Sequence, residues 1–199
     1  MITVASIVEG QGEAAALPVL LRRVCEWQTP HATLHVPAPI RVYKDRFLNK
    51  EDEFRRHLLL AAAKCGDDGL ILVLLDADDD CPAARGPEIL QRAQAIVPHR
   101  HVSVVLANRE YEAWFIAAAA SLHGHRNFTF DASQGSREAE IPRNAKGWMA
   151  RRMGGVGYNE TTDQPAFTAR MNLEMAFENS RSFRKLCKDW LRFNSPHRS

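Results

Sequence analysis

Acidic side chains follow two apolar runs of the chain with a spacing that suits a hard cation. Glu9 comes directly after the run Ile2–Val8, and Asp76 and Asp78 come after the run Leu70–Leu75. Residues two apart in an extended segment point the same way, so the two aspartates can face one ion. Several carboxylates packed together need a compensating cation, and oxygen ligands without nearby His or Cys favour Mg²⁺ or Mn²⁺. The sequence therefore predicts a magnesium or manganese site.

Further acidic residues lie near these positions. Asp80 ends the acidic run that follows Leu70–Leu75. Glu110 and Glu112 follow a further apolar segment, His101–Ala107. Chemistry in an open parallel sheet lies beyond the carboxyl ends of the strands, so we expect Asp80 and Glu110 to be additional metal ligands. Glu112 is slightly less favoured because it lies farther from the strand end. Any one of these acids alone is more often a helix cap or a solvated loop residue.

Three other motifs fit less well. The segment Gly10–Ala15 matches the dinucleotide-binding pattern GxGxxG/A, but Glu9 and Glu13 flank it and would repel a pyrophosphate. The aspartate spacing begins like an EF-hand, but Cys81 and Pro87 occupy the positions of its glycine and final glutamate. A phosphatase that uses two aspartates as nucleophile and acid would normally carry them after the first strand, and here they follow the third.

The elements that must position these acids alternate between strands and helices. Strands are expected at residues 2–8, 33–42, 70–75 and 101–107, and helices at 13–27, 50–64, 82–97 and 109–122. Pro37 and Pro39 interrupt the second strand, which should be short, bulged or near an edge. The alternation predicts an α/β fold with a mostly parallel four-stranded sheet, Rossmann-like in layout and flanked by helices.

The chain is expected to divide into two segments. Residues 1–125 should form the α/β domain, and residues 126–199 a loop and a basic, mainly helical extension packed on it. The clearest helix of the extension has apolar residues at i, i+3, i+4, i+7 and i+8, and Ser180 or Ser182 can cap it. Its apolar residues are Phe183, Leu186, Cys187, Trp190 and Leu191. Core packing is the more frequent role of such a face.

Charge is unevenly placed along the chain. Residues 1–136 hold 14 basic and 17 acidic side chains, whereas residues 137–199 hold 12 and 7. A basic segment beside an acidic one suggests a surface that binds a polyanion next to a metal site, although both can be ordinary solvated faces. The candidate residues for nucleic-acid binding are Arg109, Arg143, Lys146, Arg151 and Arg152.

Composition and local sequence favour a cytoplasmic protein without a membrane anchor. No apolar run approaches the roughly 20 residues of a membrane-spanning helix. The first ten residues have no basic leader and are typical of a strand. The four cysteines form no CxxC pair, which is typical of reduced thiols.

The two acidic motifs together resemble the Toprim domain. That domain occurs in topoisomerases, bacterial primases, recombination-mediator proteins and the nucleases named for overcoming a lysogenisation defect. The resemblance covers roughly residues 1–120 and is carried by the segments Val8–Gly10 and Leu74–Asp78, whose order, spacing and placement after strands agree with the domain. It implies that Glu9 is a metal ligand or general acid/base and that Asp76 and Asp78 hold Mg²⁺. Asp80 matches a position that is often acidic.

Two later segments resemble a more specific family. Asn108–Trp114 and residues 146–183 are similar to small bacterial Toprim-like proteins of unknown function. Such proteins are often encoded beside ATPases, and some of these pairs are linked to phage defence. The resemblance therefore implies an effector role beside an ATPase partner.

The resemblance also implies phosphodiester chemistry. Topoisomerases and primases need further domains, so hydrolysis of DNA or RNA is the expected activity, with Glu9, Asp76 and Asp78 as catalytic residues and Mg²⁺ or Mn²⁺ as cofactor. Two alternatives stay open. The chain can be a non-catalytic or conditionally active partner of an ATPase, with its last helix as the interface. It can also act on a small phosphorylated molecule in a closed pocket.

Overall fold

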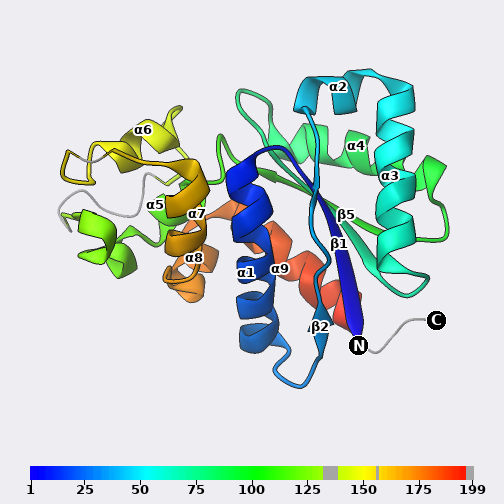
Figure 1. Cartoon of the computed structure of the whole chain (residues 1–199), viewed down its shortest axis with the longest axis horizontal. Helices are drawn as coiled ribbons and strands as arrows, with labels where there is room; N and C mark the ends of the chain where they lie inside the picture. Colours follow the sequence, from blue (N-terminus) through cyan, green and yellow to red (C-terminus); the bar gives the residue numbers. More distant parts are fainter. Residues whose placement is uncertain (132–138, 156, 196–199) are drawn as a thin grey trace.

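A single parallel sheet organises the chain (Figure 1). The computed structural model describes residues 1–131, 139–155 and 157–195. Within them, five strands pair in the order β2-β1-β4-β5, with β3 also on β1. The strands are β1 (Ile2–Val8), β2 (Leu34–His35), β3 (Ile40–Arg41), β4 (Leu70–Asp76) and β5 (His101–Ala107). All pairs are parallel, which confirms the predicted α/β fold and brings the carboxyl ends of β1, β4 and β5 to one edge.

The predicted second strand is divided into two very short strands. β2 pairs with the beginning of β1, where Ile2 lies opposite Leu34, and β3 pairs with its end, where Ile7 lies opposite Ile40. The prolines at positions 37 and 39 lie between them. Proline has no N–H to donate to a ladder, so the sheet gains a fifth strand in place of a longer second one.

Alternating residues of the central strands bury two separate hydrophobic cores. Leu70, Leu72 and Leu74 of β4 pack in the first core, and Ile71, Val73 and Leu75 pack in the second. The first core is covered by α1 (Gln11–Gln28), α5 (Ala113–Ala117) and α9 (Arg181–Asn194). The second is covered by α2 (Lys44–Asn49), α3 (Glu51–Cys65) and α4 (Pro82–Ile96). A central strand buried on both faces explains its unbroken apolar run.

The segment after β5 lies mainly on the first face of the sheet (Figure 1). It contains α5, the short 3₁₀ turns η1 (Ala119–Leu122) and η2 (His125–Asn127), and the helices α6 (Ala145–Ala150), α7 (Glu160–Thr168), α8 (Leu173–Asn179) and α9. α7 packs along α1, and α9 packs against β5. This region is therefore built into the same core as the N-terminal strands.

The last helix turns its apolar face to the core. The backbone N–H of Phe183 donates to Ser180 Oγ at 3.2 Å, which caps the helix at the first of the two predicted serines. Phe183, Leu186, Cys187 and Trp190 are buried, whereas Leu191 is 43% exposed. The core-packing role of this face is confirmed. No helix of the described residues is both long enough and apolar enough to cross a membrane.

A glycine allows the close contact between α1 and α7. A Cβ atom on Gly12 would lie 2.1 Å from Gln164 Oε1 and 2.9 Å from the backbone oxygen of Glu160. No side chain fits there, so the glycine after the first strand serves helix packing.

Candidate functional site

The ends of β4 and β5 are joined by an interlocked pair of strained residues. Asp78 and Arg109 both have positive φ angles, of 52° and 67°. The N–H of Asp78 donates to the backbone oxygen of Arg109 at 2.9 Å, and Arg109 Nη1 donates to the backbone oxygen of Asp78 at 3.0 Å. Residues other than glycine adopt this conformation only where the surroundings enforce it, and such strain gathers at functional sites. It also delays the predicted helix at 109–122, because α5 begins only at Ala113.

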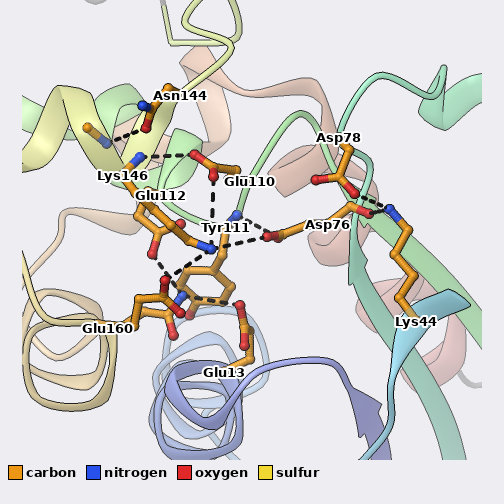
Figure 2. A network of polar contacts seen from close by, with 12 residues as sticks. Glu13, Lys44, Asp76, Asp78, Glu110, Tyr111, Glu112, Asn144, Lys146 and Glu160 are labelled. Atoms are coloured by element: carbon orange, nitrogen blue, oxygen red, sulfur yellow. Dashed lines mark hydrogen bonds and ion pairs between the residues drawn. The ribbon is translucent and has the colours of Figure 1, made fainter.

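Two lysines divide the acidic residues of this edge into two groups. On the first, which we call the Lys44 side, Lys44 begins α2 directly after β3. Its Nζ donates to Asp78 Oδ2 at 2.5 Å and to the backbone oxygen of Asp76 at 2.7 Å (Figure 2). The Asp78 side chain is 65% exposed. The carboxylate of this ion pair is therefore open to solvent and to a ligand, whereas the Lys44 side chain is only 11% exposed.

On the second, the Lys146 side, one ammonium group serves several carboxylates. Lys146 Nζ lies 3.3 Å from Glu160 Oε1, 3.8 Å from Asp76 Oδ2 and 3.9 Å from Glu110 Oε1 (Figure 2). The backbone N–H of Lys146 also donates to Glu110 Oε2 at 2.9 Å. Burial lowers the pKa of Lys146, but Glu112, Asp76, Glu160 and Glu110 raise it more, so that the side chain stays charged.

Asp76 is the aspartate held inside the protein. Its side chain is 12% exposed, and its Oδ1 accepts the N–H of Tyr111 at 2.8 Å. Burial raises the pKa of Asp76 well above its usual value, and the charges of Glu13 and Glu112 raise it further. Lys146 and the Tyr111 N–H oppose that rise. The two aspartates of the motif thus lie in different environments, one buried and one exposed.

Glu112 is completely buried beside them. Its Oε1 accepts hydrogen bonds from Tyr158 Oη at 2.8 Å and from Gln164 Nε2 at 3.2 Å. Its Oε2 has no hydrogen-bond partner among the described residues. Burial raises the pKa of Glu112 to about 7, although Lys146 and the Tyr158 hydroxyl lower it. Glu112 is therefore a buried carboxyl group beside the site, held by Tyr158 and Gln164 and out of reach of solvent.

The first strand contributes Glu9 and, through α1, Glu13. Burial raises the pKa of Glu9, and Asp78 and Glu13 raise it further, whereas Lys44 and Lys146 lower it. Glu13 is buried, and its Oε1 accepts from Gln164 Nε2 at 3.5 Å. These acids join those of the other strands in what we call the carboxylate cluster: Glu9, Glu13, Asp76, Asp78, Glu110, Glu112 and Glu160.

The predicted nucleic-acid-binding residues divide between two places. Arg109 Nη1 and Arg143 Nη2 both pair with Asp79 Oδ1, at 2.9 Å and 3.3 Å, beside the carboxylate cluster. Lys146 lies inside that cluster. Arg151 and Arg152 follow the end of α6 and line a separate small hollow, where Arg152 lies 3.6 Å above the Trp148 ring.

The donor set suits a hard cation, but its present arrangement does not form a closed metal site. The cluster consists of carboxylates, and burial together with like charge raises the pKa of Glu9 and of Asp76. Among the described residues, however, no three Asp, Glu, His or Cys side chains converge as a metal site requires. The ammonium groups of Lys44 and Lys146 lie against the aspartates instead. Asp80, also a predicted ligand, is exposed and lines a neighbouring pocket.

Several residues of the cluster were missed by sequence reasoning. Lys44 follows the second predicted strand. Because ligands lie beyond the carboxyl ends of the strands, its position in the sequence could have identified it as a site residue. Glu13 was considered only as an obstacle to a pyrophosphate. Glu160 and Gln164 carried no usable signal, because the packing of α7 on α1 brings them in from a distant part of the chain.

Comparison with known proteins assigns a family. The sequence profile of a domain of unknown function, DUF4276, matches residues 8–190. This chain belongs to the DUF4276 family. The matched range includes both the Lys44 side and the Lys146 side, so the DUF4276 domain contains the whole carboxylate cluster. No curated protein and no solved structure matches the chain significantly.

Proposed function

We propose that this chain is a Toprim-type phosphodiester hydrolase that acts on nucleic acid with Mg²⁺ or Mn²⁺. One observation carries the proposal. Glu9, Asp76 and Asp78 lie at the ends of adjacent parallel strands, within a cluster of seven carboxyl groups whose charge is offset only in part by Lys44 and Lys146. The carboxyl edge of the strands is where open α/β sheets place their ligands.

The metal would be held by Glu9, Asp76 and Asp78, with Asp80 and Glu110 as further candidates. Binding requires Lys44 to leave Asp78, and the exposure of that aspartate leaves room for the exchange. When bound, the ion would polarise the phosphate and lower the pKa of water. Arg109, Arg143 and the displaced Lys44 would hold phosphate oxygens, and Glu9 would accept a proton from the attacking water.

The role as an ATPase-linked defence effector remains part of this proposal, with a partner-activated protein as the alternative. Nothing in the last helix favours that alternative, because most of its apolar face is buried in the chain's own core.

The direct test is cleavage of labelled single- and double-stranded DNA and RNA with Mg²⁺ or Mn²⁺. Asp76→Asn keeps the size of the side chain and an acceptor for the Tyr111 N–H but removes the charge. We expect at least about 100-fold slower cleavage, because even outer-shell partners of a metal are worth 10–100-fold. The matched control is Asp68→Asn, an exposed aspartate at the opposite end of β4. Equal cleavage by both variants, or none by the wild type, would contradict the proposal.

A further inference from the structure

A pocket of about 650 Å³ lies along the outer edge of the sheet. Its walls come from Gly86 and Leu90 of α4, Val104 and Leu106 of β5, and Arg181 and Lys185 of α9. In the described sheet β5 pairs with β4 alone, so the pocket opens at an edge strand between helices of opposite faces. Its size is within the range of roughly 300–1,000 Å³ that is typical of ligand pockets.

This pocket, the β5-edge pocket, begins where the carboxylate cluster ends. Asp79, Asp80 and Arg109 line it, and Asp79 and Asp80 directly follow the exposed aspartate of the motif. Glu9, Asp76 and Asp78 are not part of its lining. A ligand in the pocket would therefore lie next to the proposed reaction centre without occupying it.

The lining is apolar along α4 and β5 and carries charges of both signs elsewhere: the acids Asp79, Asp80 and Glu140 and the cations Arg109, Arg181 and Lys185. Pro82, Ala83 and Pro87 add to the apolar wall. Arg109 already pairs with Asp79 and Lys185 with Asp189, whereas no ion pair among the described residues uses Arg181. The apolar walls suit the faces of a heterocyclic base, and Arg181 at the rim suits one flanking phosphate.

We propose that the β5-edge pocket holds an unstacked nucleobase of the substrate strand while the neighbouring phosphodiester lies at the carboxylate cluster. The inference rests on the proposed function and adds the substrate class. A paired and stacked base must leave its duplex to enter such a pocket, whereas an unpaired strand pays no such energy. The substrate is therefore single-stranded, or has an unpaired nucleotide beside the cleaved bond.

Gly86 offers a way to fill the pocket without disturbing the fold. A Cβ atom added there would meet nothing within 4 Å, and the residue lies inside α4. Gly86→Leu projects an apolar side chain into the pocket, and circular dichroism must show an unchanged fold because the residue precedes Pro87, whose ring crowds a preceding Cβ in a helix. Ala95→Leu adds a similar side chain to the exposed face of the same helix and is the matched control.

Cys81 reports occupancy without any need for catalysis. Of the four cysteines, all of which belong to the described residues, Cys81 alone is exposed, and it lines the pocket. The experiment measures the rate of its alkylation in the presence of single-stranded deoxy- and ribo-tetranucleotides. An abasic strand with the same phosphates and a blunt hairpin duplex are the comparisons, and Ca²⁺ replaces Mg²⁺.

We expect at least one tetranucleotide to slow alkylation, and the abasic strand and the duplex to have little effect. Gly86→Leu should weaken this protection about tenfold, the scale of one base contact, and Ala95→Leu should leave it unchanged. Equal protection by the abasic strand would overturn the proposal. Absence of protection by every nucleic-acid strand would also overturn it, and the β5 edge would then be open to a β-strand of a partner protein.

Cleavage of the same nucleic-acid strands with Mg²⁺ tests the base pocket and the proposed hydrolase activity separately. Metal-dependent cutting that Gly86→Leu does not change would overturn the base pocket and leave the hydrolase. Protection of Cys81 by bases without cutting on any strand would support the pocket and overturn the hydrolase.

Discussion

The two lysines of the carboxylate cluster do the same electrostatic work in different surroundings. Lys44 neutralises an aspartate that is 65% exposed, whereas Lys146 lies among partly buried carboxylates and beside the fully buried Glu112. The Coulomb attraction of an exposed pair is nearly cancelled by water, but a buried carboxylate that loses its counter-ion remains uncompensated. The comparison separates a side of the site that can exchange partners from a side that holds the fold together.

The largest effect should come from removing the counter-ion of the buried side. Lys146→Met keeps most of the apolar stem of the side chain and deletes its charge. We expect the free energy of unfolding at pH 7 to fall by about 2–3 kcal/mol, somewhat less than for a fully buried pair because Lys146 is partly exposed. Urea denaturation followed by circular dichroism measures it. A loss below about 1 kcal/mol would remove the distinction between the two sides.

A pH series tests the same side through Glu112. Between pH 4.5 and about 7 the folded protein keeps a proton on Glu112 that the unfolded chain has released. Stability therefore falls as pH rises through this window. Gln resembles the protonated acid, so Glu112→Gln should be more stable than the wild type by roughly 2 kcal/mol at pH 6 and about equal to it at pH 4.5. The control is Glu174→Gln, an exposed residue of α8, and a similar pH profile for both variants would contradict the prediction.

The smallest effect on stability is expected on the exposed side. Lys44→Met should change the free energy of unfolding by less than about 1 kcal/mol, because the Asp78 carboxylate is solvated and methionine keeps most of the apolar stem of the largely buried lysine. The same variant should bind single-stranded nucleic acid more weakly and with a shallower salt dependence, since one phosphate contact is lost. Fluorescence anisotropy between 50 and 200 mM salt follows both quantities. Unchanged binding would assign Lys44 to the fold alone.

The contrast between the two sides also explains which residues of the site could be predicted from the sequence. Glu9, Asp76 and Asp78 directly follow strands. In a parallel sheet the carboxyl ends of the strands lie at one edge, so the local sequence pattern is enough to predict where these residues lie. The parallel pairing of the strands follows from the same alternation, whereas the strand order and the helices that cover each face were not predicted. The broken second strand was predicted from its prolines, but not its division into two strands that pair with different parts of β1.

The rest of the cluster depends on packing that a local pattern does not encode. Arg109 was expected to begin a helix, and its positive φ angle is set by its hydrogen bonds to Asp78. Lys146 was a candidate both for nucleic-acid binding and, through the Toprim resemblance, for a lysine in the metal site. It lies among carboxylates because α6 and α7 pack on the first core. Glu160 and Gln164 reach the site only through the contact of α7 with α1.

The contact of Gly12 with Gln164 determines how late in synthesis of the chain the carboxylate cluster can be completed. Glu13 and Gln164 are 151 residues apart in the sequence, yet they share a hydrogen bond at the centre of the cluster. At roughly 5–20 residues per second, a ribosome needs on the order of 10–30 s to make the chain between them. During that interval the first strand and helix carry their acids without the residues that later enclose them. The cluster is therefore completed only after most of the polypeptide has left the ribosome.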